Sequence, residues 1–174
     1  MADKYCQNAI GLYARMQSAY SKYHSAETAL IRVVNDIQRA IDDQCESVLV
    51  SLDLSAAFDT IDLEILLERL RFHYGFSNLV LQSFTSYLID RPQRIVLDKF
   101  SSQPRLLSCR VPQGSVLEPV LFSLHISPLE DVIMTHGLNA MMYANDFQLY
   151  IVMRQSYRAT ALQDLMLCIQ DIMS

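Results

Sequence analysis

Two short apolar segments, far apart in the chain, constrain its fold more than any other feature. The segment Val48–Leu54 is an apolar run with β-branched residues, and Met141–Tyr150 is apolar on both sides of a polar Asn145-Asp146 pair. Such runs are typical of strands, and the first predicts a strand buried on both faces. Each segment delivers a carboxylate (Asp53 and Asp146), which is costly in an apolar strand unless a cation or hydrogen bonds receive it. The pairing indicates a shared divalent metal, with unrelated capping or turn aspartates as the alternative.

The rest of the chain alternates between helical periodicity and short strand-like runs. Apolar residues at helical spacing predict helices at 25–41, 61–71, 79–88, 116–134 and from Tyr157 onward. Strand composition predicts short strands at 94–97, 106–109, 139–143 and 147–152. The last two strands form a hairpin with Asn145 and Asp146 at its tip, and Pro128 is expected to kink or interrupt the long helix. This order of elements predicts an α+β fold.

Length and composition indicate one globular domain, or a piece of a larger one. Of the 174 residues, 51% are apolar and only nine are Gly or Pro, which excludes a disordered or fibrous chain. No apolar run reaches the roughly 18 residues of a membrane-spanning helix, and the N-terminus lacks the apolar core of a secretory signal. We therefore expect an intracellular chain that is neither secreted nor bound to a membrane. Its four scattered cysteines are expected to be isolated thiols, although two disulfides are conceivable.

The charge is unevenly distributed. The net charge of −5 argues against a simple phosphate-binding module, because such domains are usually basic. Residues 42–68 hold eight acidic residues and no lysine or arginine, whereas residues 91–110 hold five basic residues and one acid. These zones suit a metal site beside a polyanion track, but solvated faces explain them equally well. Charge alone does not decide between them.

Three short motifs follow one another along the chain: Leu52–Thr60 (LDLSAAFDT), Val111–Ser115 (VPQGS) and Tyr143–Asp146 (YAND). Their order and residues resemble three motifs of reverse transcriptases, in particular those of non-LTR, LINE-type retrotransposons. The stretches Gln17–Tyr20 and His24–Leu30 resemble the fingers segment of the same enzymes. The resemblance covers nearly the whole chain, from about residue 15 onward.

This resemblance implies part of a right-hand polymerase fold. Its fingers and palm portions would be present, with an antiparallel palm sheet packed on helices. The fingers segment would occupy about residues 1–47, and the palm about 48–174 with inserted fingers strands near 91–110. The thumb is expected to be absent, because the sequence stops at Ser174.

The resemblance also implies roles for individual residues. Asp53 and Asp146 resemble the metal-binding aspartates of the palm, which would hold Mg²⁺, or Mn²⁺ in its place. The positions that resemble nucleotide contacts are Leu54, Phe58, Gln113 and Gly114. Phe58 resembles the aromatic residue that crowds a nucleotide 2′-hydroxyl. The implied partners are an RNA template, a DNA primer and deoxynucleoside triphosphates, in the nucleus or cytoplasm, with the oligomeric state open.

Four positions depart from the family pattern. Asn145 stands where the family has the first of two adjacent aspartates, and it brings no charge to the metal. Ser21 replaces a basic residue of the fingers segment. Arg110 and Glu118 replace glycines around the VPQGS motif, although Glu118 also completes a capping-box pattern with Ser115. We therefore expect catalysis and metal binding to be weak or lost.

Two further hypotheses remain open beside an impaired enzyme. The basic segment 91–110 indicates a non-catalytic module, derived from a retrotransposon, that binds RNA or a protein. The departures from the motifs are equally consistent with a decaying reading frame that has no selected role. A chain that fails to fold would support the second of these.

Overall fold

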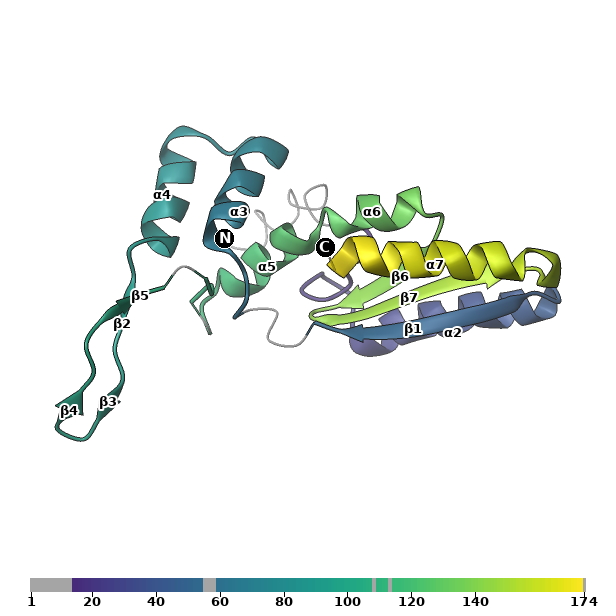
Figure 1. Cartoon of the computed structure of the whole chain (residues 1–174), viewed down its shortest axis with the longest axis horizontal. Coiled ribbons are helices and arrows are strands. Elements are labelled where there is room, and N and C mark those ends of the chain that lie inside the picture. The colour runs from purple at the N-terminus through teal and green to yellow at the C-terminus, as the bar shows by residue number, and fades with distance from the viewer. Residues whose placement is uncertain (1–13, 55–58, 108, 113, 174) are drawn as a thin grey trace. The chain divides into compact units, whose positions relative to one another are not determined.

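The structure is a computed structural model that describes residues 14–54, 59–107, 109–112 and 114–173 (Figure 1). The chain divides into two compact units. The first comprises residues 1–55 and 126–174, and the second comprises residues 56–125. Helices and antiparallel strands occur in both units, which confirms the predicted α+β class.

The first unit is built on a three-stranded antiparallel sheet. Its strands are β1 (Glu46–Asp53), β6 (Asn139–Tyr143) and β7 (Asp146–Met153), in the order β1-β7-β6. The predicted hairpin is confirmed, but its turn comprises Ala144 and Asn145, so that Asp146 is the first residue of β7. The central strand therefore joins two segments that are far apart in the sequence.

One face of this sheet is closed by two helices from the C-terminal part of the chain. Helices α6 (Leu129–Thr135) and α7 (Arg158–Met173) pack on β6 and β7. The strand residues on this face are buried: Ala140, Met142, Phe147, Leu149, Ile151 and Met153. Each large side chain buried in this way contributes about 1.5–3 kcal/mol, so this layer is the main core of the unit. In α7 the buried residues are Ala161, Leu165 and Cys168.

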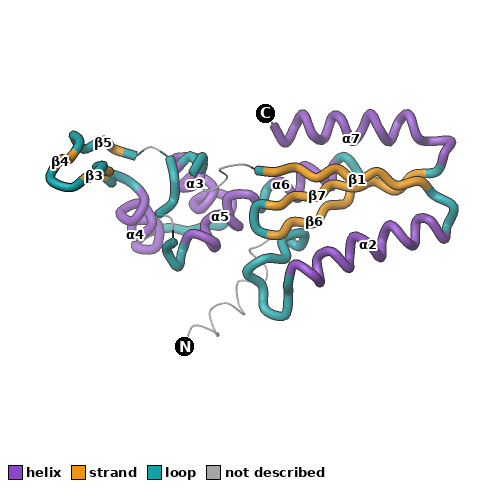
Figure 2. Tube along the Cα trace, turned by 90° about the horizontal axis from the view of Figure 1, so that it is seen from below, coloured by secondary structure: helices purple, strands orange, loops and turns teal. Residues whose placement is uncertain are grey.

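The opposite face of the sheet is covered by α2 (Ala26–Asp42), and Figure 2 shows α2 and α7 on opposite sides of the strands. Ser25 caps this helix, because its hydroxyl accepts a hydrogen bond from the Thr28 amide and the Thr28 hydroxyl accepts one from the Ser25 amide. A small cluster joins α2 to β6 and β7; its buried members are Ala29, Val33, Met141 and Tyr150.

The prediction that β1 is buried on both faces is wrong. Leu49 is 46% exposed, and Ser51 and Asp53 are exposed on the same side of the strand. The physical reason is that these residues lie on the α2 face, where the buried cluster joins α2 to β6 and β7 and leaves this side of β1 accessible. An apolar run predicts an extended strand, but burial also depends on which neighbouring elements cover it.

The second unit contains short helices and two small hairpins. Helix α3 (Leu63–Glu68) is capped by Asp62, whose Oδ1 accepts from two backbone amides, and it continues as a π-helical turn over Arg69–His73. Helix α4 spans Asn78–Leu88. Four short strands pair as β2 with β5 and β3 with β4; their bounds are Pro92–Gln93, Val96–Leu97, Phe100–Ser101 and Arg105–Leu106.

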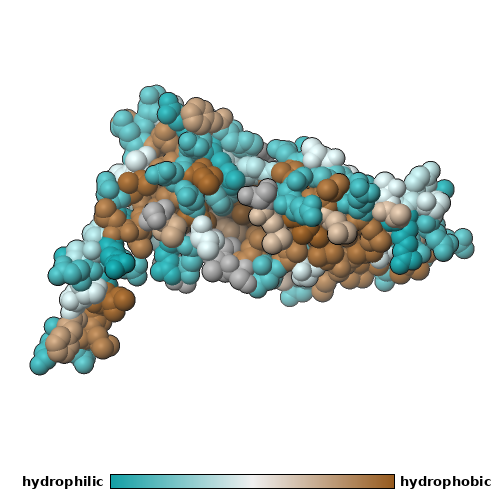
Figure 3. Space-filling model, viewed as in Figure 1, coloured by the Kyte–Doolittle hydropathy of each residue, from teal (hydrophilic) through white to brown (hydrophobic). Residues whose placement is uncertain are grey.

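The two strands predicted at 94–97 and 106–109 are therefore four shorter ones. The chain reverses at Asp98, which has a positive φ of 50°, so that β3 pairs with β4 directly after it. The tip of the β3–β4 hairpin exposes apolar side chains, which form the brown patch at its end in Figure 3.

The long helix predicted over 116–134 is interrupted at Pro128, as expected. Helix α5 spans Glu118–Ile126, and Pro128 immediately precedes α6. A proline inside a helix removes one backbone donor and clashes with the preceding turn, so the break was predictable from the sequence.

Two expectations from composition can be compared with the described part of the chain. Its helices are each too short or too polar to cross a bilayer. Its cysteines, Cys45, Cys109 and Cys168, are unpaired thiols. Cys6 lies outside the described residues.

Candidate functional site

The sheet places the two predicted carboxylates directly opposite each other. Asp53, the last residue of β1, is the cross-strand partner of Asp146, the first residue of β7, and Tyr143 of β6 continues the same row. Cα atoms of directly opposed residues in antiparallel strands lie about 4.5–5.5 Å apart, and their side chains share one face. Both aspartates are exposed. The sequence prediction that the two segments converge is confirmed.

The hairpin turn places Asn145 immediately beside this pair. Ala144 has a positive φ of 56°, a conformation that costs a residue with a Cβ about 1–2 kcal/mol. This left-handed residue reverses the chain between β6 and β7. Asn145, Asp146 and Asp53 are therefore consecutive or cross-strand neighbours at one end of the sheet.

Sequence reasoning gave no role to Gln17, which contacts this turn. Its side chain is buried, and its Nε2 donates to the Ala144 carbonyl at 3.2 Å. Its Oε1 accepts from the Ala144 amide at 3.2 Å and from the Ala19 amide at 3.0 Å. The contact spans 127 positions of the sequence, so no local pattern indicates it.

The side chains of Asp53, Asp146 and Asn145 offer oxygen atoms as metal ligands. Two carboxylates and the Asn145 amide oxygen suit a hard cation such as Mg²⁺, which prefers oxygen ligands and keeps several water molecules. The donors carry two formal negative charges, because Asn145 is neutral. Within the described ranges, no group of three or more acidic, histidine or cysteine side chains is placed to hold a metal. The residues therefore fit a divalent cation, but they supply only two negative charges to it.

The nucleotide-contacting positions suggested by the resemblance are only partly described. Leu54 follows β1 directly and is half-buried. Gly114 belongs to the second unit, where its amide donates to the Glu118 carboxylate. Phe58 and Gln113 lie outside the described residues, so their predicted roles stay predictions.

The backbone of Arg110 has a conformation that suits glycine. Its φ is 82°, in the left-handed region that glycine adopts without steric cost. The Arg110 Nε donates to Asp59 Oδ1 at 2.7 Å, and this hydrogen bond lowers the pKa of the Asp59 carboxyl. The same bond raises the pKa of the Arg110 guanidinium. An ion pair therefore accompanies a strained backbone at the position where the resemblance predicts a glycine.

Glu118, the other position where the resemblance predicts a glycine, makes hydrogen bonds at the start of α5. Its amide donates to the Ser115 hydroxyl at 3.2 Å, which is half of the predicted capping box. Its carboxylate accepts from the Gly114 amide instead of the Ser115 amide, so the reciprocal half is shifted by one residue. This carboxylate is thus engaged with the backbone of the VPQGS motif.

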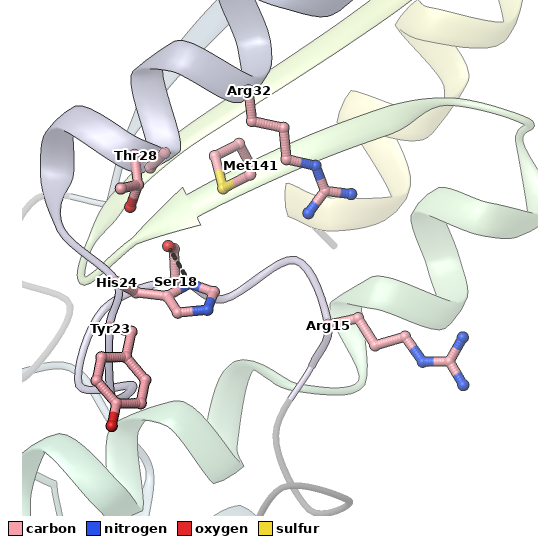
Figure 4. Close-up of a pocket in the computed structure, with 8 residues that line it drawn as sticks. Arg15, Ser18, Tyr23, His24, Thr28, Arg32 and Met141 are labelled. Carbon is pink, nitrogen blue, oxygen red and sulfur yellow. Dashed lines mark hydrogen bonds between the residues drawn. The ribbon is translucent and has the colours of Figure 1, made fainter.

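A small pocket lies in the first unit beside the start of α2, and Figure 4 shows the side chains that line it. Arg15, Arg32 and His24 are its basic residues, and Met141 of β6 forms part of its wall. The Ser18 hydroxyl is hydrogen-bonded to His24 Nδ1 at 2.8 Å. This bond ties the segment that contains Gln17 to the loop before α2.

Together, fold and site define an α+β domain with opposed carboxylates at one end of an antiparallel sheet. The family model for reverse transcriptase (RNA-dependent DNA polymerase) matches residues 2–173 of the chain. The chain therefore belongs to the reverse transcriptase family, as the motifs indicated.

Two curated proteins of Drosophila melanogaster are similar to this chain. It is 31% identical over 118 residues to "Probable RNA-directed DNA polymerase from transposon BS", covering 65% of this chain and 12% of that protein. It is 29% identical over 125 residues to "RNA-directed DNA polymerase from mobile element jockey", covering 71% of this chain and 13% of that protein. The match thus spans a small share of each relative and supports the resemblance to mobile-element enzymes.

Proposed function

We propose that this chain is a fingers-and-palm portion of a reverse transcriptase of the LINE type, with impaired catalysis. The native reaction would add deoxynucleotides to a primer 3′-hydroxyl, copied from an RNA template. The observation that carries the proposal is the register that sets Asp53 opposite Asp146. Family membership and the similarity to mobile-element polymerases support the assignment.

In this reaction the acidic side chains of the chain would hold the catalytic cations in place. Asp53 and Asp146 would hold divalent cations, with the Asn145 amide oxygen as a neutral neighbour. When bound, such ions activate the attacking oxygen and stabilise the leaving group. Leu54, Phe58, Gln113 and Gly114 would contact the incoming nucleotide, and Phe58 would select against a 2′-hydroxyl.

The expected impairment follows from the missing charge at Asn145. One unit charge pair at 4 Å contributes about 4 kcal/mol at an effective dielectric constant of about 20, and desolvation leaves only a fraction of it. Each 1.4 kcal/mol of transition-state stabilisation corresponds to about a tenfold change in rate. A loss of several kcal/mol would therefore lower the rate on the order of a thousandfold.

Primer extension with the Asn145→Asp variant tests this proposal. We expect the parent chain to extend an RNA-templated DNA primer weakly or not at all, and the variant to gain at least about a hundredfold in Mg²⁺ or Mn²⁺. Asn139→Asp is the matched control, since it adds a carboxylate at the opposite end of β6 and should leave extension unchanged. Robust extension by the parent chain would overturn the claim of impairment. Absence of Mn²⁺ binding in both the parent and Asn145→Asp would overturn the metal site.

A second candidate function rests on the basic hairpins of the second unit. Arg94, Lys99 and Arg105 are exposed there, and Phe100 is 69% exposed with the Lys99 ammonium 5.6 Å from its ring centre. The other two basic residues of this segment are engaged locally, because Arg91 donates to the Leu88 and Arg110 carbonyls and Arg110 pairs with Asp59. Exposed cations beside an aromatic ring suit a nucleic-acid backbone and its bases.

Salt dependence distinguishes this function from catalysis. Binding to an RNA–DNA hybrid should weaken steeply as salt rises, and replacing Arg94, Lys99 and Arg105 by alanine should flatten that dependence. Asn145→Asp is the control, because it changes the sheet unit and leaves the hairpin charges intact. No detectable binding at low salt would exclude the nucleic-acid version of this function.

A further inference from the structure

The strongest unassigned feature is the side-chain amide of Gln17, which contacts both backbone groups of one turn residue. We propose that Gln17 is a positioning residue that fixes the β6–β7 turn and thereby the placement of Asp146 opposite Asp53. The functional importance of this placement rests on the proposed metal-dependent reaction. The hydrogen bonds between Gln17 and the turn, called the clamp below, are a property of the fold and can be tested separately.

The hydrogen bonds determine the orientation of the Gln17 amide. Its Oε1 accepts from the amides of Ala144 and Ala19, and its Nε2 donates to the Ala144 carbonyl. A flipped amide would set donor against donor and acceptor against acceptor. The primary amide of Gln carries a fixed acceptor and a fixed donor in one planar group, and its side chain is one methylene longer than that of Asn.

The turn needs such support because of its backbone conformation. Ala144 has a positive φ, and it carries a Cβ that makes this conformation unfavourable. Conformations of this kind persist where surrounding contacts over-determine them. Gln17 is only 5% exposed; its hydrogen bond with Ala19 is buried and its two hydrogen bonds with Ala144 are part-buried, so the access of competing water to them is restricted.

The segment that carries Gln17 is itself anchored to the sheet. The Ser18 amide donates to the Met142 carbonyl, and the Met142 amide donates to the Met16 carbonyl, both at 2.8 Å. Gln17 and Met142 form a parallel bridge beside β6. The hydrogen bond between Ser18 and His24 holds the far side of the segment, as Figure 4 shows. The clamp is thus a rigid extension of the sheet.

Amide hydrogen exchange measured by NMR tests the clamp directly. Gln17→Met keeps the approximate side-chain volume but removes both kinds of hydrogen bond, and Gln17→Ala removes the side chain. Loss of one hydrogen bond should lower the protection factor of the Ala144 amide about tenfold. The contact between Asp53 and Asp146, followed by cross-strand nuclear Overhauser effects, should weaken in parallel. Gln38→Ala, at an exposed position of α2, is the matched control and should change neither signal.

Gln17→Glu supplies a readout that general destabilisation would not move. At neutral pH the introduced carboxylate opposes the Ala144 carbonyl and cannot donate to it. Once protonated at acid pH, it presents one acceptor and one donor and should restore the Ala144 protection factor. A variant that merely loosens the fold would show no such recovery.

The outcomes separate the clamp from the proposed reaction. Unchanged Ala144 protection in all three Gln17 variants would overturn the clamp. Lost protection with intact contacts between Asp53 and Asp146 would overturn the positioning role. Where the parent or Asn145→Asp binds Mn²⁺, Gln17→Met should weaken that binding about tenfold, as for other groups that orient metal ligands. Absence of Mn²⁺ binding would count against the proposed function, while the two metal-free measurements would still decide the role of Gln17.

Discussion

The two faces of the sheet β1-β7-β6 use the same strands for different purposes. On the face towards α6 and α7, residues such as Phe147 and Leu149 are buried. On the face towards α2, burial is confined to the cluster around Tyr150, and the end with Asp53 and Asp146 is exposed. Since side chains alternate along a strand, neighbouring residues of β7 belong to opposite faces. Along β7, residues that stabilise the core therefore alternate with residues on the face of the candidate site.

The largest expected contrast between the faces is in core packing. Phe147→Ala should lower the free energy of unfolding by about 3–5 kcal/mol, because it leaves a cavity in a closed layer. Leu49→Ala, at a 46% exposed position of β1, should cost less than about 1 kcal/mol. Urea unfolding followed by circular dichroism measures both. Similar losses for the two variants would show that the α2 face is also a closed core.

Tyr150 provides the next test, since it is the buried polar contact on the α2 face. Its hydroxyl donates to Asp36 Oδ2 at 2.6 Å, and burial together with this bond raises its pKa to about 12. Tyr150→Phe should cost about 1 kcal/mol, the usual net contribution of one hydrogen bond. Tyr157→Phe, at an exposed position, is the control and should cost almost nothing.

The raised pKa of Tyr150 also gives a pH dependence with a definite sign. The unfolded chain loses the phenol proton near pH 10, whereas the folded chain keeps it until about pH 12. The free energy of unfolding should therefore fall as the pH rises across this range. Ultraviolet titration should show a tyrosine ionising near pH 12 that disappears in Tyr150→Phe. A titration unchanged by the substitution would contradict the assignment.

Much of the sheet and of the candidate site was predictable because it depends on local patterns. The apolar runs around Asp53 and Asp146 predicted strands, and the polar pair at 145–146 predicted a hairpin. What remained undetermined was the packing around β1, because an apolar run does not specify its neighbours. The exposure of Leu49 results from incomplete covering of β1 on the α2 face, which is a property of the tertiary structure.

Two other features escaped prediction for different physical reasons. Gln17 acts on a turn that is 127 positions away, and its side chain leaves no periodicity in the sequence. Arg110 is unremarkable as a residue type, but the structure places it at a positive φ. The available signal was the glycine that the resemblance predicts at this position, because glycine often marks a left-handed backbone. Reading that glycine as a backbone requirement would have predicted the strain.

The smallest expected effect concerns the two opposed carboxylates, and it has opposite signs without and with metal. Without divalent cations, Asp146→Asn should raise the free energy of unfolding by about 0.5 kcal/mol, because like charges directly opposite each other are destabilising. With Mn²⁺, the parent chain should gain thermal stability as the ion concentration rises, and the variant should lose this dependence. Asp131→Asn, at an exposed position of α6, should keep the response to Mn²⁺. If Asp146→Asn destabilised the metal-free chain, the open face would hold Asp146 as a structural residue, and the separation between the two faces would fail at this position.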